Sequence, residues 1–152
     1  MVFLIRLPIR PHFLAGVATV GVVACVGMVG AARADTLVSF RTPSGNIGCV
    51  YLSGPAQPNL RCDIRSGLQP RPSKPPGCLH LNWGDSYEMN STGRVGLTCH
   101  GDTAILPNSR VLRYGSVLKL RGFVCRSRAV GLRCRNLTGH GFFLSRRHSY
   151  RF

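Results

Sequence analysis

Carboxylates are scarce in this chain of 152 residues, which has 5 Asp and Glu against 20 Lys and Arg. Catalysis by two carboxylates and metal binding through oxygen ligands both need acidic side chains in groups. The chain also lacks Gly-x-Ser-x-Gly, His-Glu-x-x-His and a phosphate-binding loop. The sequence therefore has no signature motif of the common hydrolases or nucleotide-binding proteins, and we expect no cofactor.

Close cysteine pairs are also missing. No Cys-x-x-Cys occurs among the seven cysteines, whereas structural zinc sites usually present two thiolates from one turn. We therefore expect no metal and assign six cysteines to disulfides formed in an oxidising compartment. They are Cys49, Cys62, Cys78, Cys99, Cys125 and Cys134. Several pairings are possible, and hairpin geometry favours neighbours: Cys49–Cys62, Cys78–Cys99 and Cys125–Cys134.

The N-terminal segment predicts export. Arg6 and Arg10 precede an apolar run without charge, residues 13–32, and small residues follow in an Ala-Arg-Ala sequence. This is the pattern of a cleavable signal peptide over residues 1–34.

Two other fates of this segment stay open. The run could be retained as a membrane anchor, or Cys25 could be lipidated. We expect cleavage because glycines weaken the run as a helix, and because loss of Cys25 leaves an even number of cysteines. The mature chain, residues 35–152, is then secreted or held in the cell envelope and has no transmembrane segment.

The mature chain predicts an all-β fold. Short runs rich in Val, Ile, Leu, Phe and Thr alternate with Gly and Pro turns, and helical spacing of apolar residues is not sustained. Residues 66–78 hold four prolines and should form an extended surface loop. The expected strands are residues 36–41, 46–52, 59–65, 94–99, 110–113, 116–126, 131–137 and 141–146. We predict one mainly antiparallel, disulfide-stabilised domain over residues 35–152, a small sandwich or barrel.

Residues 116–136 predict a face rich in arginine. Apolar and cationic side chains alternate along them, as in half-buried strands, and Gly122 is expected to be a bulge. If Cys125 and Cys134 pair across a hairpin, both face the core, and four arginines face the opposite side. These are Arg126, Arg128, Arg133 and Arg135.

Positive charge is concentrated in the C-terminal part. Residues 103–152 contain eleven Lys or Arg and no carboxylate. Without Arg6, Arg10 and Arg33, the chain keeps 17 basic and 5 acidic residues, a net charge of +12. Such a surface attracts acidic lipids, wall phosphopolymers and other polyanions. Nucleic acid is the less favoured partner, because an exported chain seldom meets it. We expect most aromatic side chains here in the core and residues 146–152 as a solvated tail.

The order of several motifs resembles a family of secreted bacterial proteins of unknown function, common in actinobacteria and also seen in proteobacteria. The motifs are residues 40–49 (FRTPSGNIGC), 61–64 (RCDI), 99–103 (CHGDT), 112–115 (LRYG), 125–127 (CRS), 134–136 (CRN) and 139–142 (GHGF). The resemblance implies a single disulfide-bonded domain behind a signal peptide and brings no activity with it. Two departures are Asn82, where relatives often carry Asp, and the absence of a tryptophan before the proline-rich loop.

These patterns predict a non-catalytic exported module that binds an anionic partner through Arg126, Arg128, Arg133 and Arg135. One alternative is a small secreted hydrolase using His100 or His140 with Asp102, which requires these groups to converge in one cleft. Another is an inhibitor or toxin-like module whose reactive segment is the proline-rich loop.

Overall fold

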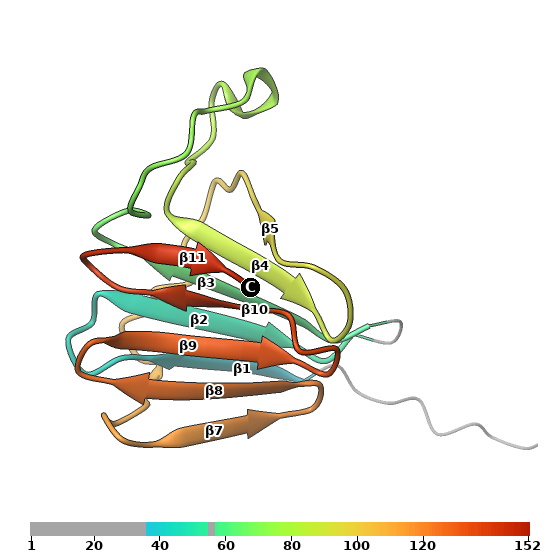
Figure 1. The fold of residues 1–152 in the computed structure, drawn as a ribbon, viewed down its shortest axis with the longest axis vertical. Helices are drawn as coiled ribbons and strands as arrows, with labels where there is room; N and C mark the ends of the chain where they lie inside the picture. The colour runs from blue at the N-terminus through green and yellow to red at the C-terminus, as the bar shows by residue number, and fades with distance from the viewer. Residues whose placement is uncertain (1–35, 55–56) are drawn as a thin grey trace, which may run out of the picture. The chain divides into compact units, whose positions relative to one another are not determined.

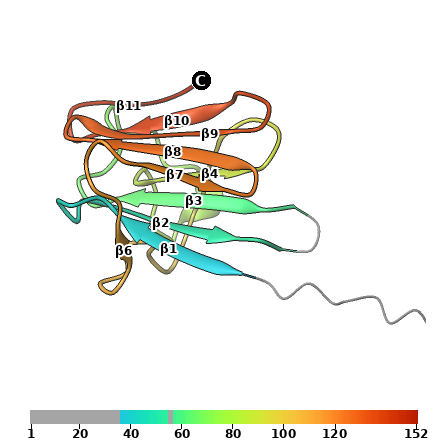
Figure 2. The same ribbon diagram turned by 90° about the horizontal axis from the view of Figure 1, so that it is seen from below.

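The structure is a computed structural model that describes residues 36–54 and 57–152. The predicted signal peptide, residues 1–34, lies outside the described residues, and so does Cys25. Two β-sheets stack face to face, as Figures 1 and 2 show. Over the described ranges, no helix has the length and apolar character needed to cross a membrane.

The first sheet has six strands in the order β5-β4-β3-β2-β1-β6. Its neighbours run antiparallel, except that β6 is parallel to β1. The strands are β1 (Leu37–Arg41), β2 (Ile47–Leu52), β3 (Asn59–Ile64), β4 (Ser86–Asn90), β5 (Gly96–Leu97) and β6 (Arg110–Val111).

The second sheet has five strands in the order β11-β10-β9-β8-β7, all antiparallel. It is therefore a simple meander, in which each strand pairs with the one before it in sequence. The strands are β7 (Val117–Leu120), β8 (Phe123–Arg128), β9 (Gly131–Asn136), β10 (Gly141–Leu144) and β11 (Ser149–Arg151).

Disulfides fix the central hairpin of each sheet. Cys49–Cys62 joins paired positions of β2 and β3, and Cys125–Cys134 joins paired positions of β8 and β9. All four sulfur-bearing residues are fully buried. The third bridge, Cys78–Cys99, ties the proline-rich loop and its 3-10 helix η1 (Pro76–Cys78) to the segment after β5. The predicted pairings of neighbouring cysteines are confirmed.

Aromatic contacts join the two sheets through one core. The rings of Tyr51 and Phe123 lie edge to face with centroids 5.9 Å apart, and the centroids of Tyr87 and Phe142 are 5.6 Å apart. Each pair takes one ring from each sheet. The predicted sandwich is thus confirmed, and its inner faces are apolar while its outer faces are free to carry charge.

Gly122 is not a bulge, and the single strand predicted over residues 116–126 is wrong. Gly122 has a φ of +91°, which lies in the left-handed region that a tight turn uses and that glycine adopts without steric cost. The chain reverses there, so that Leu120 pairs with Phe123. Two antiparallel strands, β7 and β8, replace one long strand.

Two strands were not expected from the sequence. β4 has the sequence SYEMN, which is poor in β-branched residues, yet it fills the position between β3 and β5. β11 lies within the predicted solvated tail, where Tyr150 pairs with Phe143 of β10. Both strands owe their conformation to pairing with a neighbour rather than to their own propensity.

Candidate functional site

The outer face of β8 and β9 carries four exposed arginines. Along β8 the burial alternates, with Phe123 and Cys125 buried and the arginines exposed. The same alternation on β9 buries Leu132 and Cys134. Arg126, Arg128, Arg133 and Arg135, here called the arginine face, therefore point away from the core, as the spacing predicts. In Figure 1, β8 and β9 lie in front of the first sheet, with this face toward the viewer.

The strand register places like charges next to one another. Arg126 lies directly opposite Arg133 in the β8–β9 pair, and Arg135 lies opposite Val124. Like charges across a ladder are mildly destabilising. The ion pairs found within residues 36–54 and 57–152 involve only Arg61 and His100 as cations. The arginine face is therefore a concentration of positive charge that has no counter-ion among the described residues.

Aromatic rings lie beside the arginine face on β10 and β11. The guanidinium carbon of Arg133 is 3.6 Å from the ring centroid of Phe152, and its Nη1 is 3.4 Å from the hydroxyl of Tyr150. Phe143 lies opposite Arg133 in the strand register, with its ring centroid 5.4 Å from that of Tyr150. A cation held over an aromatic face gains modest electrostatic energy, so these contacts orient Arg133.

The expectation that most of these rings lie in the core is wrong. Phe123 and Phe142 are buried, but Tyr150 is 43 % exposed and Phe143 and Phe152 are only partly covered. Strand alternation turns Phe143 outward, because its neighbours Phe142 and Leu144 face the core. Two glycines on the outer face leave room for the rings. A Cβ at Gly131 would lie 2.6 Å from Cζ of Phe143, and one at Gly141 would lie 2.6 Å from Cζ of Phe152. The rings lie over backbone that has no side chain of its own.

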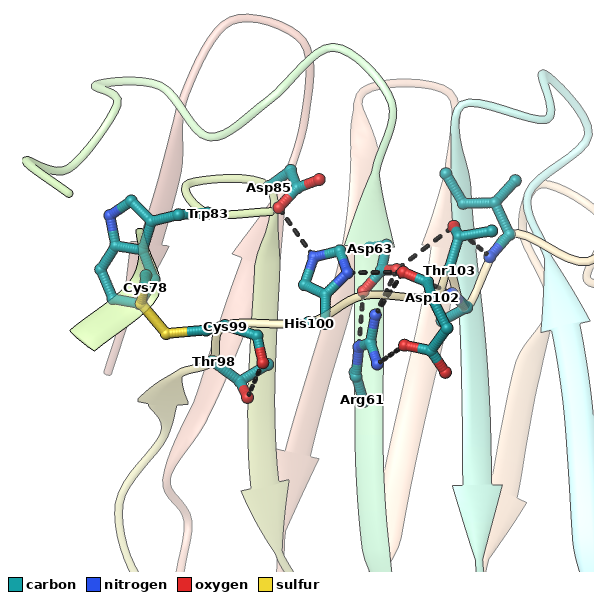
Figure 3. A network of polar contacts seen from close by, with 12 residues as sticks. Arg61, Asp63, Cys78, Trp83, Asp85, Thr98, Cys99, His100, Asp102 and Thr103 are labelled. Atoms are coloured by element: carbon teal, nitrogen blue, oxygen red, sulfur yellow. Dashed lines mark hydrogen bonds and ion pairs between the residues drawn. A yellow bond between two sulfur atoms is a disulfide. The ribbon is translucent and has the colours of Figure 1, made fainter. Parts of the chain in front are cut away.

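A separate polar network lies on the first sheet (Figure 3). Arg61 donates from Nε and Nη2 to the two oxygens of Asp63, each at 2.9 Å, and from Nη1 to Asp102 at 2.7 Å. Asp63 is buried and also accepts the backbone N–H of Ala104 at 2.7 Å. The hydrogen bond from Arg61 lowers the pKa of Asp102, and the positive charge of Arg61 lowers it further. Asp63 thereby anchors the loop after His100 to β3.

His100 and Asp102 do not form the pair that the hydrolase hypothesis expects. The His100 ring is buried, with Nε2 2.9 Å from a carboxylate oxygen of Asp85 and Nδ1 2.6 Å from the backbone carbonyl of Asp102. Both ring nitrogens are engaged, and the Asp102 carboxylate is held by Arg61 instead. His140 lies elsewhere, between β9 and β10 of the second sheet. A general base needs a nitrogen within reach of its substrate, and this arrangement gives His100 a structural role.

The proline-rich loop is ordered by its own polar contacts. The Trp83 Nε1 donates to the carbonyl of Ser73 at 2.9 Å, and Lys74 Nζ donates to the carbonyl of Leu79 at 3.1 Å. The loop projects beyond the sheets in Figure 1 and leaves Leu79 72 % exposed. Within the loop, Pro75 has extended backbone angles, φ −73° and ψ 152°, and Leu79, just after the loop, has helical ones, φ −46° and ψ −45°. The hypothesis that this loop is an inhibitory segment stays a prediction.

Comparison with known proteins gives a family but no activity. No curated protein matches the chain, and no solved structure matches it. The sequence model of a family of unknown function, DUF6636, matches residues 20–152. The match includes both sheets, all three disulfides and the arginine face. The chain belongs to this family of unknown function, DUF6636.

Proposed function

We propose that the protein is a non-catalytic binding module that holds an anionic partner on the arginine face, outside the cytoplasm. The partner is an acidic lipid surface, a wall phosphopolymer or another polyanion. The observation that carries the proposal is the alignment of Arg126, Arg128, Arg133 and Arg135 on one exposed face of two adjacent strands. Three disulfides support an oxidising compartment, where such bridges persist.

The charge distribution favours a polymer or surface over a single small anion for this face. The four guanidiniums extend along two strands, and no carboxylate occurs anywhere in residues 103–152. Guanidinium groups form bidentate hydrogen bonds with phosphate and carboxylate and are weakly hydrated, which lowers the cost of contact. An extended ligand with repeated negative charges engages several of them at once.

The hairpin of β8 and β9 that carries the arginine face is cross-linked, which favours ligand binding. The Cys125–Cys134 bridge joins paired positions of β8 and β9, so it constrains the register that sets the spacing of the four arginines. Binding then has to order only the side chains, which costs less than ordering a loop.

The test is binding to immobilised heparin and to acidic vesicles as a function of salt. Changing Arg126, Arg128, Arg133 and Arg135 to Ser should abolish retention. For the wild type, a contact set of about four phosphates implies a roughly 10²-fold loss of affinity between 50 and 200 mM salt, because counterions are released.

A matched variant controls for net charge. Arg65, Arg94, Arg110 and Arg113 are exposed, lie outside the second sheet, and make no side-chain hydrogen bond within the described ranges. Their replacement by Ser removes the same charge and should weaken binding only slightly. Equal loss in both variants would show that binding follows net charge and would refute the assignment to the arginine face.

A further inference from the structure

A cavity of about 520 Å³ lies at one end of the sandwich, separate from the middle of the arginine face. Three connections meet there: residues 42–46 between β1 and β2, residues 129–130 between β8 and β9, and residues 145–148 between β10 and β11. In Figure 1 these three connections gather at the left edge of the two sheets. The volume falls in the range of cavities that hold small molecules, about 300–1,000 Å³. We call it the end cleft.

The end cleft combines cations with an apolar surface. Arg128 lines it from the end of β8, and Arg146 and Arg147 line it from the connection between β10 and β11. Ile47, Tyr114 and Val130 supply apolar surface. Among the residues that the structure describes, no carboxylate lines it. In the parts of the chain that the structure describes, no ion pair involves these three arginines. The cleft therefore offers guanidinium groups that can donate hydrogen bonds to a bound anion.

Hydrogen bonds hold the connections around the cleft in place. Ser145 Oγ accepts the backbone N–H groups of Arg147 and His148 at 3.3 and 3.1 Å and donates to the His148 carbonyl at 2.8 Å. On the opposite wall, the hydroxyl of Thr42 lies 3.2 Å from that of Ser44, and Arg65 N–H donates to the Asn46 carbonyl at 2.8 Å. The walls are formed before a ligand arrives, so little ordering is required on binding.

The balance of charges selects the ligand class. A monocarboxylate offers one negative charge to three guanidiniums, whereas a phosphate monoester carries about −1.5 to −2 at pH 7 and three acceptor oxygens. The apolar wall favours a ligand whose phosphate is attached to a ring or hydrocarbon body, since burying that body removes apolar surface from water. We propose that the end cleft binds one organic phosphate monoester, with the phosphate on Arg128, Arg146 and Arg147 and the organic body against Val130 and Tyr114. The cleft shares Arg128 with the arginine face, whereas Arg146 and Arg147 belong to the cleft alone, so variants of those two residues separate this proposal from polymer binding.

Calorimetric titration with phenyl phosphate and with inorganic phosphate at pH 7.5 tests the proposal. We expect one saturable site for phenyl phosphate, with at least about tenfold tighter binding than inorganic phosphate. Absence of saturable binding would overturn the proposal, and equal affinity for the two probes would overturn the role of the apolar wall. A pentasaccharide that ends in a phosphate monoester distinguishes the source: tighter binding than phenyl phosphate identifies a polymer end, and weaker or equal binding identifies a free small molecule.

Two pairs of variants locate the site. Arg146→Gln with Arg147→Gln should weaken phenyl phosphate binding by at least about tenfold. Arg94→Gln with Arg110→Gln, at two exposed residues outside the cleft, should change it less than about twofold. Val130 is 70 % exposed, so Val130→Glu and Val130→Gln should both fold. Only the glutamate places a repelling charge beside the phosphate, so it should bind more weakly than the glutamine variant. Equal affinities of these two variants, or equal losses in the two double variants, would place the phosphate elsewhere and overturn the proposal.

Discussion

Arg126 and Arg133 lie directly opposite one another on β8 and β9, and both are exposed. Opposite positions of an antiparallel pair place side chains close enough for like charges to repel. The hairpin keeps this pair because the Cys125–Cys134 bridge and the buried neighbours hold its register. The arginine face therefore has a small cost in stability, which the proposed anionic ligand would relieve.

Reversing one charge of this pair should stabilise the fold. Arg126→Glu replaces repulsion with attraction toward Arg133, and we expect the free energy of unfolding to rise by about 0.5 kcal/mol at low salt. The same variant should bind heparin more weakly. Urea unfolding at two salt concentrations measures the first effect, which screening should reduce. Arg126→Gln is the control and should give a smaller gain. A loss of stability in Arg126→Glu would show that the two arginines do not repel in the folded state.

Removing the buried carboxylate of the first sheet should be strongly destabilising. The Asp63 side chain is 2 % exposed and accepts hydrogen bonds from Arg61, Ala104 and Thr103. Asp63→Ala leaves the largely buried guanidinium of Arg61 with only the exposed Asp102 carboxylate and leaves the Ala104 N–H without its acceptor. We therefore expect a loss of about 3 kcal/mol in unfolding free energy.

Asp102 provides the comparison, because it binds the same arginine with a side chain that is 79 % exposed. We expect Asp102→Ala to lose less than about 1 kcal/mol, since solvent screens exposed ion pairs. Denaturant unfolding of both variants checks the difference. Similar losses would mean that burial does not distinguish the two carboxylates.

The ion pair of Asp102 should also appear in the pH dependence. The pKa of Asp102 is lowered from its ordinary value of 3.8, first by the hydrogen bond from Arg61 and then by its charge. A carboxyl whose folded pKa is depressed stabilises the fold above its unfolded pKa. Its contribution is lost as pH falls below 3.8 and through the lower folded pKa. NMR titration of the Asp102 carboxyl should give a midpoint below 3.8, and a midpoint at or above that value contradicts the assigned contact.

Loss of the β8–β9 disulfide should weaken both stability and binding. Cys125 and Cys134 are separated by 9 residues in sequence, and closure of a loop of this size is worth about 3 kcal/mol in the chain-entropy account. Cys125→Ala with Cys134→Ala should lose about that much unfolding free energy and should bind heparin less tightly, because the register of the arginine face is less constrained.

The comparison variant removes Cys78–Cys99, which ties the proline-rich loop. It should lower stability without changing heparin affinity. Peptide mapping under non-reducing conditions checks the premise for both variants. Other pairings, or free thiols among the six cysteines, would contradict the structure.

Much of the second sheet could be predicted from residues alone. Period-two alternation and one cysteine on each strand were enough to place Arg126, Arg128, Arg133 and Arg135 outward. The signal is local, because the side-chain direction of a strand depends only on its own periodicity. Gly122 misled the prediction, because an isolated glycine within an alternating run fits a bulge and a tight turn equally well.

The remaining features depend on contacts between distant segments. The sequences of β4 and β11 have little strand propensity of their own, and they become strands because they pair with β3 and β10. The end cleft unites turns that are far apart in sequence, so no local motif marks it. Phe143 and Phe152 cover Gly131 and Gly141 on the outer face, a relationship that requires the strand register.

The most direct test of the account is to observe which arginines respond when a short heparin oligosaccharide is added to the protein at low salt. Signals of the Arg Nε–Hε groups, assigned by mutation and followed by NMR, report each guanidinium separately. The account predicts saturable changes that are largest at Arg126, Arg128, Arg133 and Arg135. Largest changes at Arg65, Arg94, Arg110 and Arg113, or no saturable change at any arginine, would contradict it.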